Sequence, residues 1–205
     1  MPLKMFISDI HFFDFVYKIG KKFFTMDTST ENVTINAGVI TDMLKNYREK
    51  KDEYRELFKL ASGYESVKPT EKVPIQVYLE MCNWIEHKLG KFNLIRIGRL
   101  IGESTYETMI ANKMTSEKCT PVEVMKALII TSQTGVQDPK KRGWEILSST
   151  EKSIIMRKTQ NFNPTLQLGL LDGLIRKSGV FGVQVIFHKE IAKGAEYDEY
   201  LISWM

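Results

Sequence analysis

The stretch that decides the fold is Leu166–Trp204, LQLGLLDGLIRKSGVFGVQVIFHKEIAKGAEYDEYLISW. It predicts an apolar helix that carries Gly169 and Gly173, followed by a strand, a turn that contains Gly194 and a last strand. The stretch contains no nucleophile motif, no metal-ligand spacing and no phosphate-binding loop. This combination indicates a domain that encloses a molecule rather than one that cleaves a substrate.

The sequence just before this stretch predicts a second hairpin. Two short runs rich in β-branched and apolar residues are separated by a polar connection, which is typical of paired strands. Pro164 then lies where a helix begins, and Gly179 lies where it ends. The predicted order is β-β-α-β-β, with strands Trp144–Ser148 and Ser153–Lys158, helix Thr165–Lys177, and strands Val183–Lys189 and Tyr197–Trp204.

Helical periodicity dominates the first two-thirds of the chain. Thr120, Pro121 and Glu123 form an N-cap, a proline at the first helical position and a capping-box glutamate. Residues 25–36 are rich in Thr, Asn and Asp and predict a loop. Segregated helices and antiparallel strands indicate an α+β fold, with a helical N-terminal extension or cover at residues 1–93 and an α+β domain at 94–205. The helices are predicted at Asp9–Lys22, Ala37–Tyr47, Lys51–Ala61, Pro74–Leu89, Leu94–Ala111 and Thr120–Ser132.

Composition excludes several classes of protein. Of the 205 residues, 43% are hydrophobic and 26% are charged, which is the mix of a soluble globular chain. No apolar run approaches the roughly 20 residues of a membrane span, so we expect a cytoplasmic protein. The net charge of +4 is too mild to predict nucleic-acid binding, and the basic trio Lys140–Arg142 is expected in an exposed turn. Cys82 and Cys119 are expected as buried free thiols.

The residue types of a catalytic site are scattered. His11, His87 and His188 are isolated from one another, and no Gly-x-Ser-x-Gly elbow or dinucleotide-binding fingerprint is present. The glycine pairs Gly98/Gly102 and Gly169/Gly173 are spaced four apart on predicted helices, so they favour close helix packing. We therefore expect a protein that is not an enzyme.

Three motifs resemble a known family. Gly98–Gly102 (GRLIG) resembles the opening helix of the 4-vinyl reductase domain, Gly169–Ile175 (GLLDGLI) resembles its glycine helix, and Ile191–Gly194 (IAKG) resembles its strand-connecting turn. The likeness covers about Leu94–Trp204. That domain is similar in fold to haem–nitric oxide/oxygen binding domains and to small subunits of the TRAPP vesicle-tethering complex. The resemblance implies a sensor or scaffold with an interior that holds an apolar ligand.

Two departures from the resemblance limit what it implies. The cysteines that flank the turn in the family are replaced by Glu190 and Asp198, which cannot form a thiolate zinc site and are expected as solvated residues on a hairpin. Haem domains of the superfamily carry a Tyr-x-Ser-x-Arg pattern, whereas Met156–Gln160 reads MRKTQ and no histidine lies between His87 and His188. The sequence therefore predicts neither a metal nor a haem cofactor.

Two functions remain open. The first is a non-enzymatic protein that binds or senses an apolar small molecule, between the glycine-bearing helices and the sheet, and acts with a separate signalling partner. The alternative is a dimeric interaction scaffold without ligand, in which a filled core supports a dimer surface. We expect a homodimer, and we expect the N-terminal Phe residues to pack the extension onto the domain, or in part to form a dimer face or cap a ligand cavity. An enzyme acting on a tetrapyrrole is a weaker third option. The predicted ligand-binding residues are Tyr106, Met109, Trp144, Met156, Leu170 and Leu174.

Overall fold

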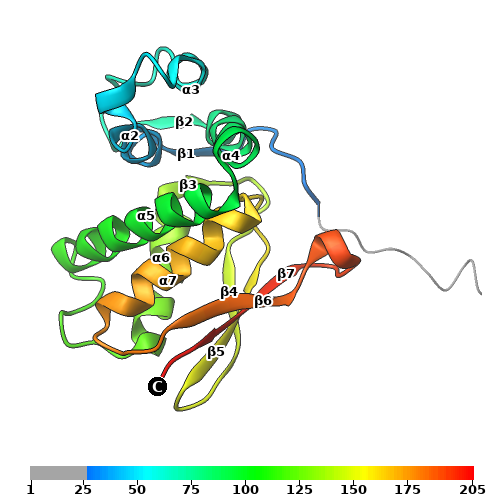
Figure 1. Ribbon diagram of the computed structural model, residues 1–205. Helices are drawn as coiled ribbons and strands as arrows, with labels where there is room; N and C mark the ends of the chain where they lie inside the picture. Colours follow the sequence, from blue (N-terminus) through cyan, green and yellow to red (C-terminus); the bar gives the residue numbers. More distant parts are fainter. Residues whose placement is uncertain (1–26) are drawn as a thin grey trace, which may run out of the picture.

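The computed structural model describes residues 27–205. It is built from helices and two antiparallel sheets (Figure 1). The predicted helix at residues 9–22 lies outside the described residues. The helices are α2 (Gly38–Lys45), α3 (Arg55–Leu60), α4 (Ile75–Leu89), α5 (Lys91–Ala111), α6 (Pro121–Gly135) and α7 (Pro164–Lys177), with short 3-10 turns η1 (Arg48–Lys50) and η2 (Ile191–Lys193). The strands are β1 (Thr34–Asn36), β2 (Lys72–Pro74), β3 (Val136–Gln137), β4 (Trp144–Ser149), β5 (Ser153–Lys158), β6 (Gln184–Lys189) and β7 (Asp198–Ser203).

The packing of α5 against α7 is the centre of the fold (Figure 1). A methyl group added at Gly98 would overlap the carbonyl oxygen of Leu166, and one added at Gly169 would overlap the carbonyl oxygen of Ile95. Only glycine lets two helix backbones approach this closely, because any side chain would hold them apart. The close packing predicted from the glycine pairs is therefore confirmed.

The larger sheet has the antiparallel order β4-β5-β7-β6, as the β-β-α-β-β pattern predicts. Alternate residues of β5 are buried, including Ile154 and Met156, and these two pair with the buried Ile202 and Tyr200 of β7. This period of two directs one face of the sheet onto α7. The β-β-α-β-β region and the α+β class are therefore confirmed.

A smaller sheet, β2-β1-β3, joins segments that are distant in sequence. Ile35 of β1 pairs with Val73 of β2 on one side and with Val136 of β3 on the other. The prediction of a loop throughout residues 25–36 is thus wrong at β1. A three-residue strand carries too little periodicity to be seen before its partners are known.

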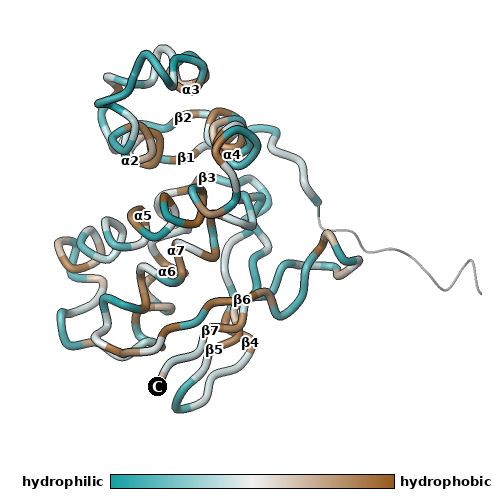
Figure 2. The backbone as a smooth tube through the Cα atoms, viewed as in Figure 1, coloured by the Kyte–Doolittle hydropathy of each residue, from teal (hydrophilic) through white to brown (hydrophobic). Residues whose placement is uncertain are grey.

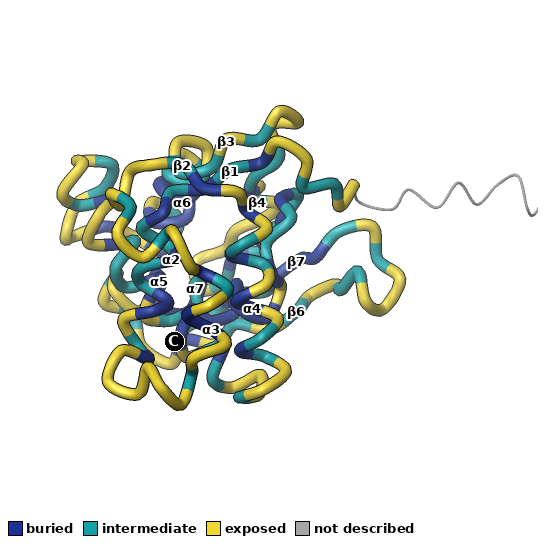
Figure 3. The backbone as a smooth tube through the Cα atoms, turned by 90° about the horizontal axis from the view of Figure 1, so that it is seen from above, coloured by how far each residue is buried: buried dark blue, intermediate teal, exposed yellow. Residues whose placement is uncertain are grey.

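The buried residues form two apolar clusters. One lies among β1, α2, α3 and α4 and continues onto Leu94, Ile97 and Ile101 of α5. The other lies between α5, α6, α7 and the larger sheet. In Figure 2 the helices carry hydrophobic stretches, drawn in brown, alongside hydrophilic ones. In Figure 3 the buried stretches, drawn in dark blue, gather between the exposed outer loops. We call residues 34–89 the N-terminal lobe and residues 91–203 the C-terminal lobe; Gly90 separates them at the start of α5.

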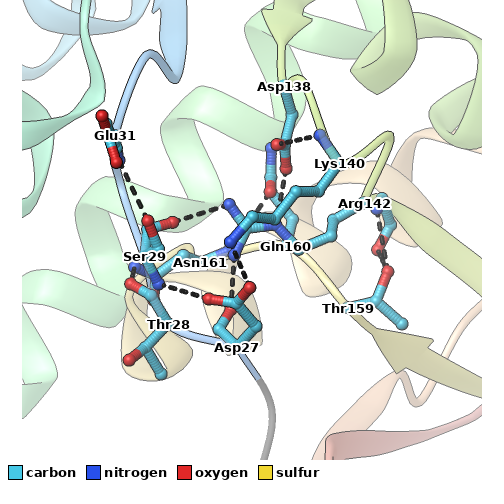
Figure 4. Close-up of polar contacts among 11 residues, drawn as sticks. Asp27, Thr28, Ser29, Glu31, Asp138, Lys140, Arg142, Thr159, Gln160 and Asn161 are labelled. Carbon is cyan, nitrogen blue, oxygen red and sulfur yellow. Dashed lines mark hydrogen bonds and ion pairs between the residues drawn. The ribbon is translucent and has the colours of Figure 1, made fainter.

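Two members of the basic trio, Lys140 and Arg142, hold the beginning of the described chain against the C-terminal lobe (Figure 4). The Arg142 side chain is 9% exposed, and its Nε donates to Asp138 Oδ2 at 2.6 Å. Its other nitrogens donate to the carbonyl oxygens of Asp27 and Ser29, while Lys140 pairs with the Asp27 carboxylate. The expectation of an exposed turn is therefore wrong for Arg142, because the guanidinium finds several acceptors at once.

We expect Arg142→Lys to loosen this attachment. An ammonium group is a compact charge that does not reproduce the planar fork, so it cannot serve Asp138 and two carbonyl oxygens together. The expected loss is about 1–2 kcal/mol in the free energy of unfolding. Limited proteolysis should cut faster near residues 27–31 in the variant. Lys141→Ala, at the exposed neighbour, is the control and should leave the cleavage rate unchanged.

Among residues 27–205, no helix is both long enough and apolar enough to cross a membrane.

Candidate functional site: a pocket between the two lobes

A pocket of about 420 Å³ lies where the two lobes meet. Its walls come from β1, α2, α4 and the Pro69–Thr70 loop on the N-terminal side, and from α5, α6, α7 and β4 on the other. This volume falls within the range of small-molecule sites, roughly 300–1,000 Å³. The pocket takes in faces of both glycine-bearing helices and Trp144 of the larger sheet, but it lies on the side of the N-terminal lobe rather than within the buried cluster between these helices and the sheet, where the sequence placed it.

One face each of α5 and α6 forms a wall of mixed chemistry. Each helix contributes four residues at intervals of three and four, which is the spacing of one helical face. Each of these faces begins with an apolar side chain, and hydroxyl groups follow toward the helix C-terminus. The residues are Ile101, Ser104, Thr105 and Thr108 of α5, and Leu128, Thr131, Ser132 and Gly135 of α6.

The apolar part of the lining is rigid. Trp144 is 4% exposed and its ring lies 5.6 Å from the ring of Tyr200, so the core behind it fixes its position. Leu166 and Leu170 of α7 line the same pocket. The close α5–α7 contact places these two leucines near the α5 face, because α7 cannot shift without separating the glycine contacts.

The charged groups of the lining neutralise each other. Asp42 accepts a hydrogen bond from Lys45 Nζ at 2.7 Å and one from Ser104 Oγ at 3.3 Å. The second contact joins α2 to α5 and therefore joins the two lobes. Among the described residues that line the pocket, Asp42 and Lys45 are the only ones with charged side chains.

A buried hydrogen bond closes the inner end. Gln167 Nε2 donates to the Tyr78 hydroxyl at 3.2 Å, and both residues are almost fully buried. Burial raises the pKa of Tyr78 well above its usual value, with Cys82 adding to the effect. The phenol therefore stays protonated across the physiological range and serves as a hydrogen-bonding group rather than as an anion.

The six predicted ligand-binding residues divide into two groups. Trp144 and Leu170 line the pocket. Tyr106, Met109, Met156 and Leu174 lie in the apolar cluster between α5, α6, α7 and the sheet and do not line it. The Tyr106 hydroxyl faces Cys119 Sγ at 3.4 Å, and burial raises the pKa of Tyr106 to about 12. A ligand-binding role for the six residues stays a prediction.

Sequence reasoning missed the polar half of the pocket. Its signal was the stripe Ser104, Thr105 and Thr108 on α5, which matches the stripe on α6. Such stripes are indistinguishable from solvated helix faces in one sequence, because hydroxyl residues are common on surfaces. The N-terminal wall gave no signal, since β1 and the Pro69–Thr70 loop reach the pocket only through long-range pairing.

The two carboxylates that flank the Ile191–Gly194 turn have different surroundings. Asp198 is 4% exposed; it pairs with Lys158 Nζ at 3.1 Å and accepts a hydrogen bond from the Ile191 backbone nitrogen at 3.0 Å. The expectation of a solvated residue is therefore wrong for Asp198, because it neutralises a buried lysine. Glu190 pairs with Lys193 on the turn. Within the described chain, no group of three His, Cys, Asp or Glu side chains is placed to hold a metal ion.

Solved structures share this arrangement of helices and strands. An Fe(II) unliganded H-NOX protein mutant from K. algicida aligns with a TM-score of 0.60 at 11% identity, over 83% of this chain and 97% of that one. A structure described as probing heme distortion in the H-NOX family aligns with a TM-score of 0.60 at 12% identity, over 83% and 95%. The chain has the H-NOX fold. An oxygen-binding H-NOX domain related to soluble guanylate cyclases aligns with a TM-score of 0.55 at 14% identity, over 82% and 91%.

Comparison of the sequence with protein families and curated proteins identifies no relative beyond this likeness to the H-NOX fold. No protein-family model matches the sequence, and no curated protein matches it. The likeness therefore concerns the fold, and the chemistry of the pocket has to be judged from its own residues.

The pocket residues do not fit haem. Haem iron is held in proteins by His, Cys, Met or Tyr, and within the described chain the lining contains none of the first three. Tyr78 is the one tyrosine there, but burial keeps its hydroxyl protonated and Gln167 already binds it. His87 and His188 are exposed and lie outside the lining. Lys45 is the one cationic side chain of the described lining; it is 61% exposed and paired with Asp42, so the buried part of the pocket offers the propionates no cation.

Proposed function

We propose that this protein is a non-enzymatic sensor that binds a small apolar molecule in the pocket between the lobes and passes the signal to a separate partner protein. The observation that carries the proposal is the pocket itself, about 420 Å³ with Trp144, Leu128 and Leu170 on its apolar side. Such a pocket at the junction of two lobes is the usual place for a small-molecule site. The H-NOX fold supports the proposal, since two of the similar structures are named for NO or oxygen ligation.

A ligand in this pocket would affect both lobes at once. The links across the pocket include the Asp42–Ser104 contact, the Tyr78–Gln167 hydrogen bond and the pairing of β1 with β3. A molecule that touches α2 on one side and α6 on the other stabilises one relative position of the lobes, by its differential affinity for that position. This gives a binding event the means to be read by a partner, which we propose is a cytoplasmic signalling protein.

The alternative proposal, a homodimeric scaffold without ligand, requires a filled interior, and the pocket argues against it. The 4-vinyl reductase-like label and the division at residue 93 stay proposals as well. Native mass spectrometry of the purified full chain, with thermal unfolding in the presence of apolar compound pools, tests the sensor function. We expect a retained small molecule, or a rise in melting temperature with at least one pool. Protein that carries nothing and is shifted by nothing would exclude the sensor.

We expect hemin to form no stoichiometric complex with this chain. Titration of the purified protein with hemin should give the Soret spectrum of free or non-specifically bound hemin, because the lining offers neither an iron ligand nor a free cation for the propionates. The measurement is difference absorption spectroscopy, with a haem-binding H-NOX protein as control. A sharp Soret band that saturates at one equivalent would contradict the prediction.

A further inference from the structure

The charge balance of the pocket defines the charge of its ligand. Asp42 and Lys45 are the charged side chains of the described lining, and their atoms are 2.7 Å apart. The Lys45 side chain is 61% exposed and that of Asp42 is 25% exposed, so this pair lies at the solvent edge of the pocket. The buried lining residues Trp144, Leu128 and Gln167 carry no charge. An ionic group placed against them would lose its hydration and find no opposite charge among the described lining residues, which makes its burial costly. The pocket therefore favours a neutral molecule over an anion or a cation.

The same lining offers hydrogen-bonding groups that the rest of the described chain leaves unused. The side-chain amide of Asn36 and the hydroxyl of Thr105 have no hydrogen-bond partner among residues 27–205. The Thr131 hydroxyl contacts Met114 Sδ at 3.2 Å, and a thioether sulfur is a weak acceptor. An amide provides two donors and an acceptor oxygen, so this side of the pocket matches a ligand that both donates and accepts.

We propose that the pocket selects a neutral, ring-sized molecule that carries a hydrogen-bonding group such as a carboxamide. Its apolar body lies against Trp144 and Leu128, and its polar group lies toward Asn36 and Thr131. The assignment deepens the proposed sensor function and rests on it. It also excludes haem as the ligand, because haem has two carboxylates and an iron atom for which the lining has no binding groups.

Three compounds with one ring system test this selection on the purified full chain. They are 2-naphthamide, which is neutral and polar, 2-naphthoate, which is an anion of nearly the same shape, and naphthalene, which has no polar group. Isothermal titration calorimetry at pH 7 is expected to give 2-naphthamide an affinity at least about ten-fold above that of 2-naphthoate, the difference that one poorly compensated charge makes. Naphthalene is expected to bind several-fold more weakly than the amide.

Two variants locate the polar group. Asn36→Leu keeps the approximate size and removes the amide, and Thr131→Val keeps the shape and removes the hydroxyl. Each is expected to lower the affinity for 2-naphthamide by about 3- to 10-fold, the effect of one hydrogen bond, and to leave naphthalene affinity unchanged. Asn83→Leu, at an exposed position on α4 outside the pocket, is the matched control and is expected to bind like the original chain. Thermal unfolding checks that each variant is folded.

The outcomes separate the two proposals. If 2-naphthoate binds as tightly as 2-naphthamide, the selection of neutral ligands is wrong and the sensor proposal is left standing. If Asn36→Leu and Thr131→Val both bind the amide as the original chain does, the assignment of the polar side is overturned. If none of the three compounds gives binding heat or changes tryptophan fluorescence at its solubility limit, the proposed selection is overturned, and the retained molecule and the compound pools then decide the sensor proposal.

Discussion

Gly169→Ala is expected to destabilise the chain by about 3 kcal/mol or more, one of the largest effects available to a single methyl group. The added carbon would overlap the carbonyl oxygen of Ile95 and press on the backbone nitrogen of Arg99 at 2.8 Å. Backbone atoms cannot rotate away as a flexible side chain can, so α5 and α7 must separate. Urea unfolding followed by far-ultraviolet circular dichroism measures the loss.

Gly135→Ala is the matched control for this prediction. Gly135 is the last residue of α6, and the nearest atom to its added carbon is Asn36 Nδ2 at 3.9 Å. There the methyl group meets no backbone, and the higher helix propensity of alanine gives a change of at most about 1 kcal/mol in the stabilising direction. Equal stabilities for the two variants would show that the α5–α7 contact is looser than the structure has it.

The sequence predicted the local structure correctly where a residue type, at a given spacing, has a single structural explanation. The glycine pairs predicted close helices because few other arrangements need glycine four apart on an apolar helix. The β-branched and apolar runs at Trp144–Ser148 and Ser153–Lys158 and the capping box at Thr120 are local signals of the same kind. The strand-like runs, together with Pro164 and Gly179 at the two ends of the helix between them, predicted the β-β-α-β-β region before any tertiary contact was known.

The pocket was beyond sequence reasoning because its walls are assembled at long range. Asn36 faces it only because β1 pairs with β3, a hundred residues further along the chain. Trp144 and Leu170 were found because they are apolar residues near the family motifs, but the same argument selected Met156 and Leu174, which lie in the filled core. Apolar character alone does not distinguish a pocket from a core, since both are lined by the same residue types.

The buried pair of Lys158 and Asp198 shows the same limit. The burial of these two residues could not be predicted from the sequence, because lysine and aspartate are nearly always exposed. Pairing of β5 with β7 sets the two opposite each other, and the Lys158 ammonium also donates to the Phe162 carbonyl oxygen at 2.6 Å. Burial lowers the pKa of Lys158, although the attraction of Asp198 opposes the change. The charge is therefore tolerated only while its partner is present.

Asp198→Asn is accordingly expected to cost about 3–5 kcal/mol in the free energy of unfolding at pH 7, the usual penalty when one member of a buried pair is removed. Asparagine keeps an oxygen for the Ile191 nitrogen, so the loss isolates the charge on Lys158. Asp42→Asn, in the partly exposed pair with Lys45, is the control and should cost less than about 1 kcal/mol.

The pH dependence and a double variant then distinguish a lost charge partner from a general loss of packing. Removing Asp198 lowers the pKa of Lys158 further in the folded chain, while the unfolded value stays near about 10.4. Between the two values the unfolded chain binds more protons, so the stability of Asp198→Asn must rise with pH, and over a wider range than in the original chain. Lys158→Met combined with Asp198→Asn removes both charges and should recover most of the loss at pH 7. A single variant whose stability is flat from pH 7 to 10, or a double variant no more stable than the single one, would mean that the pair contributes through shape rather than through charge.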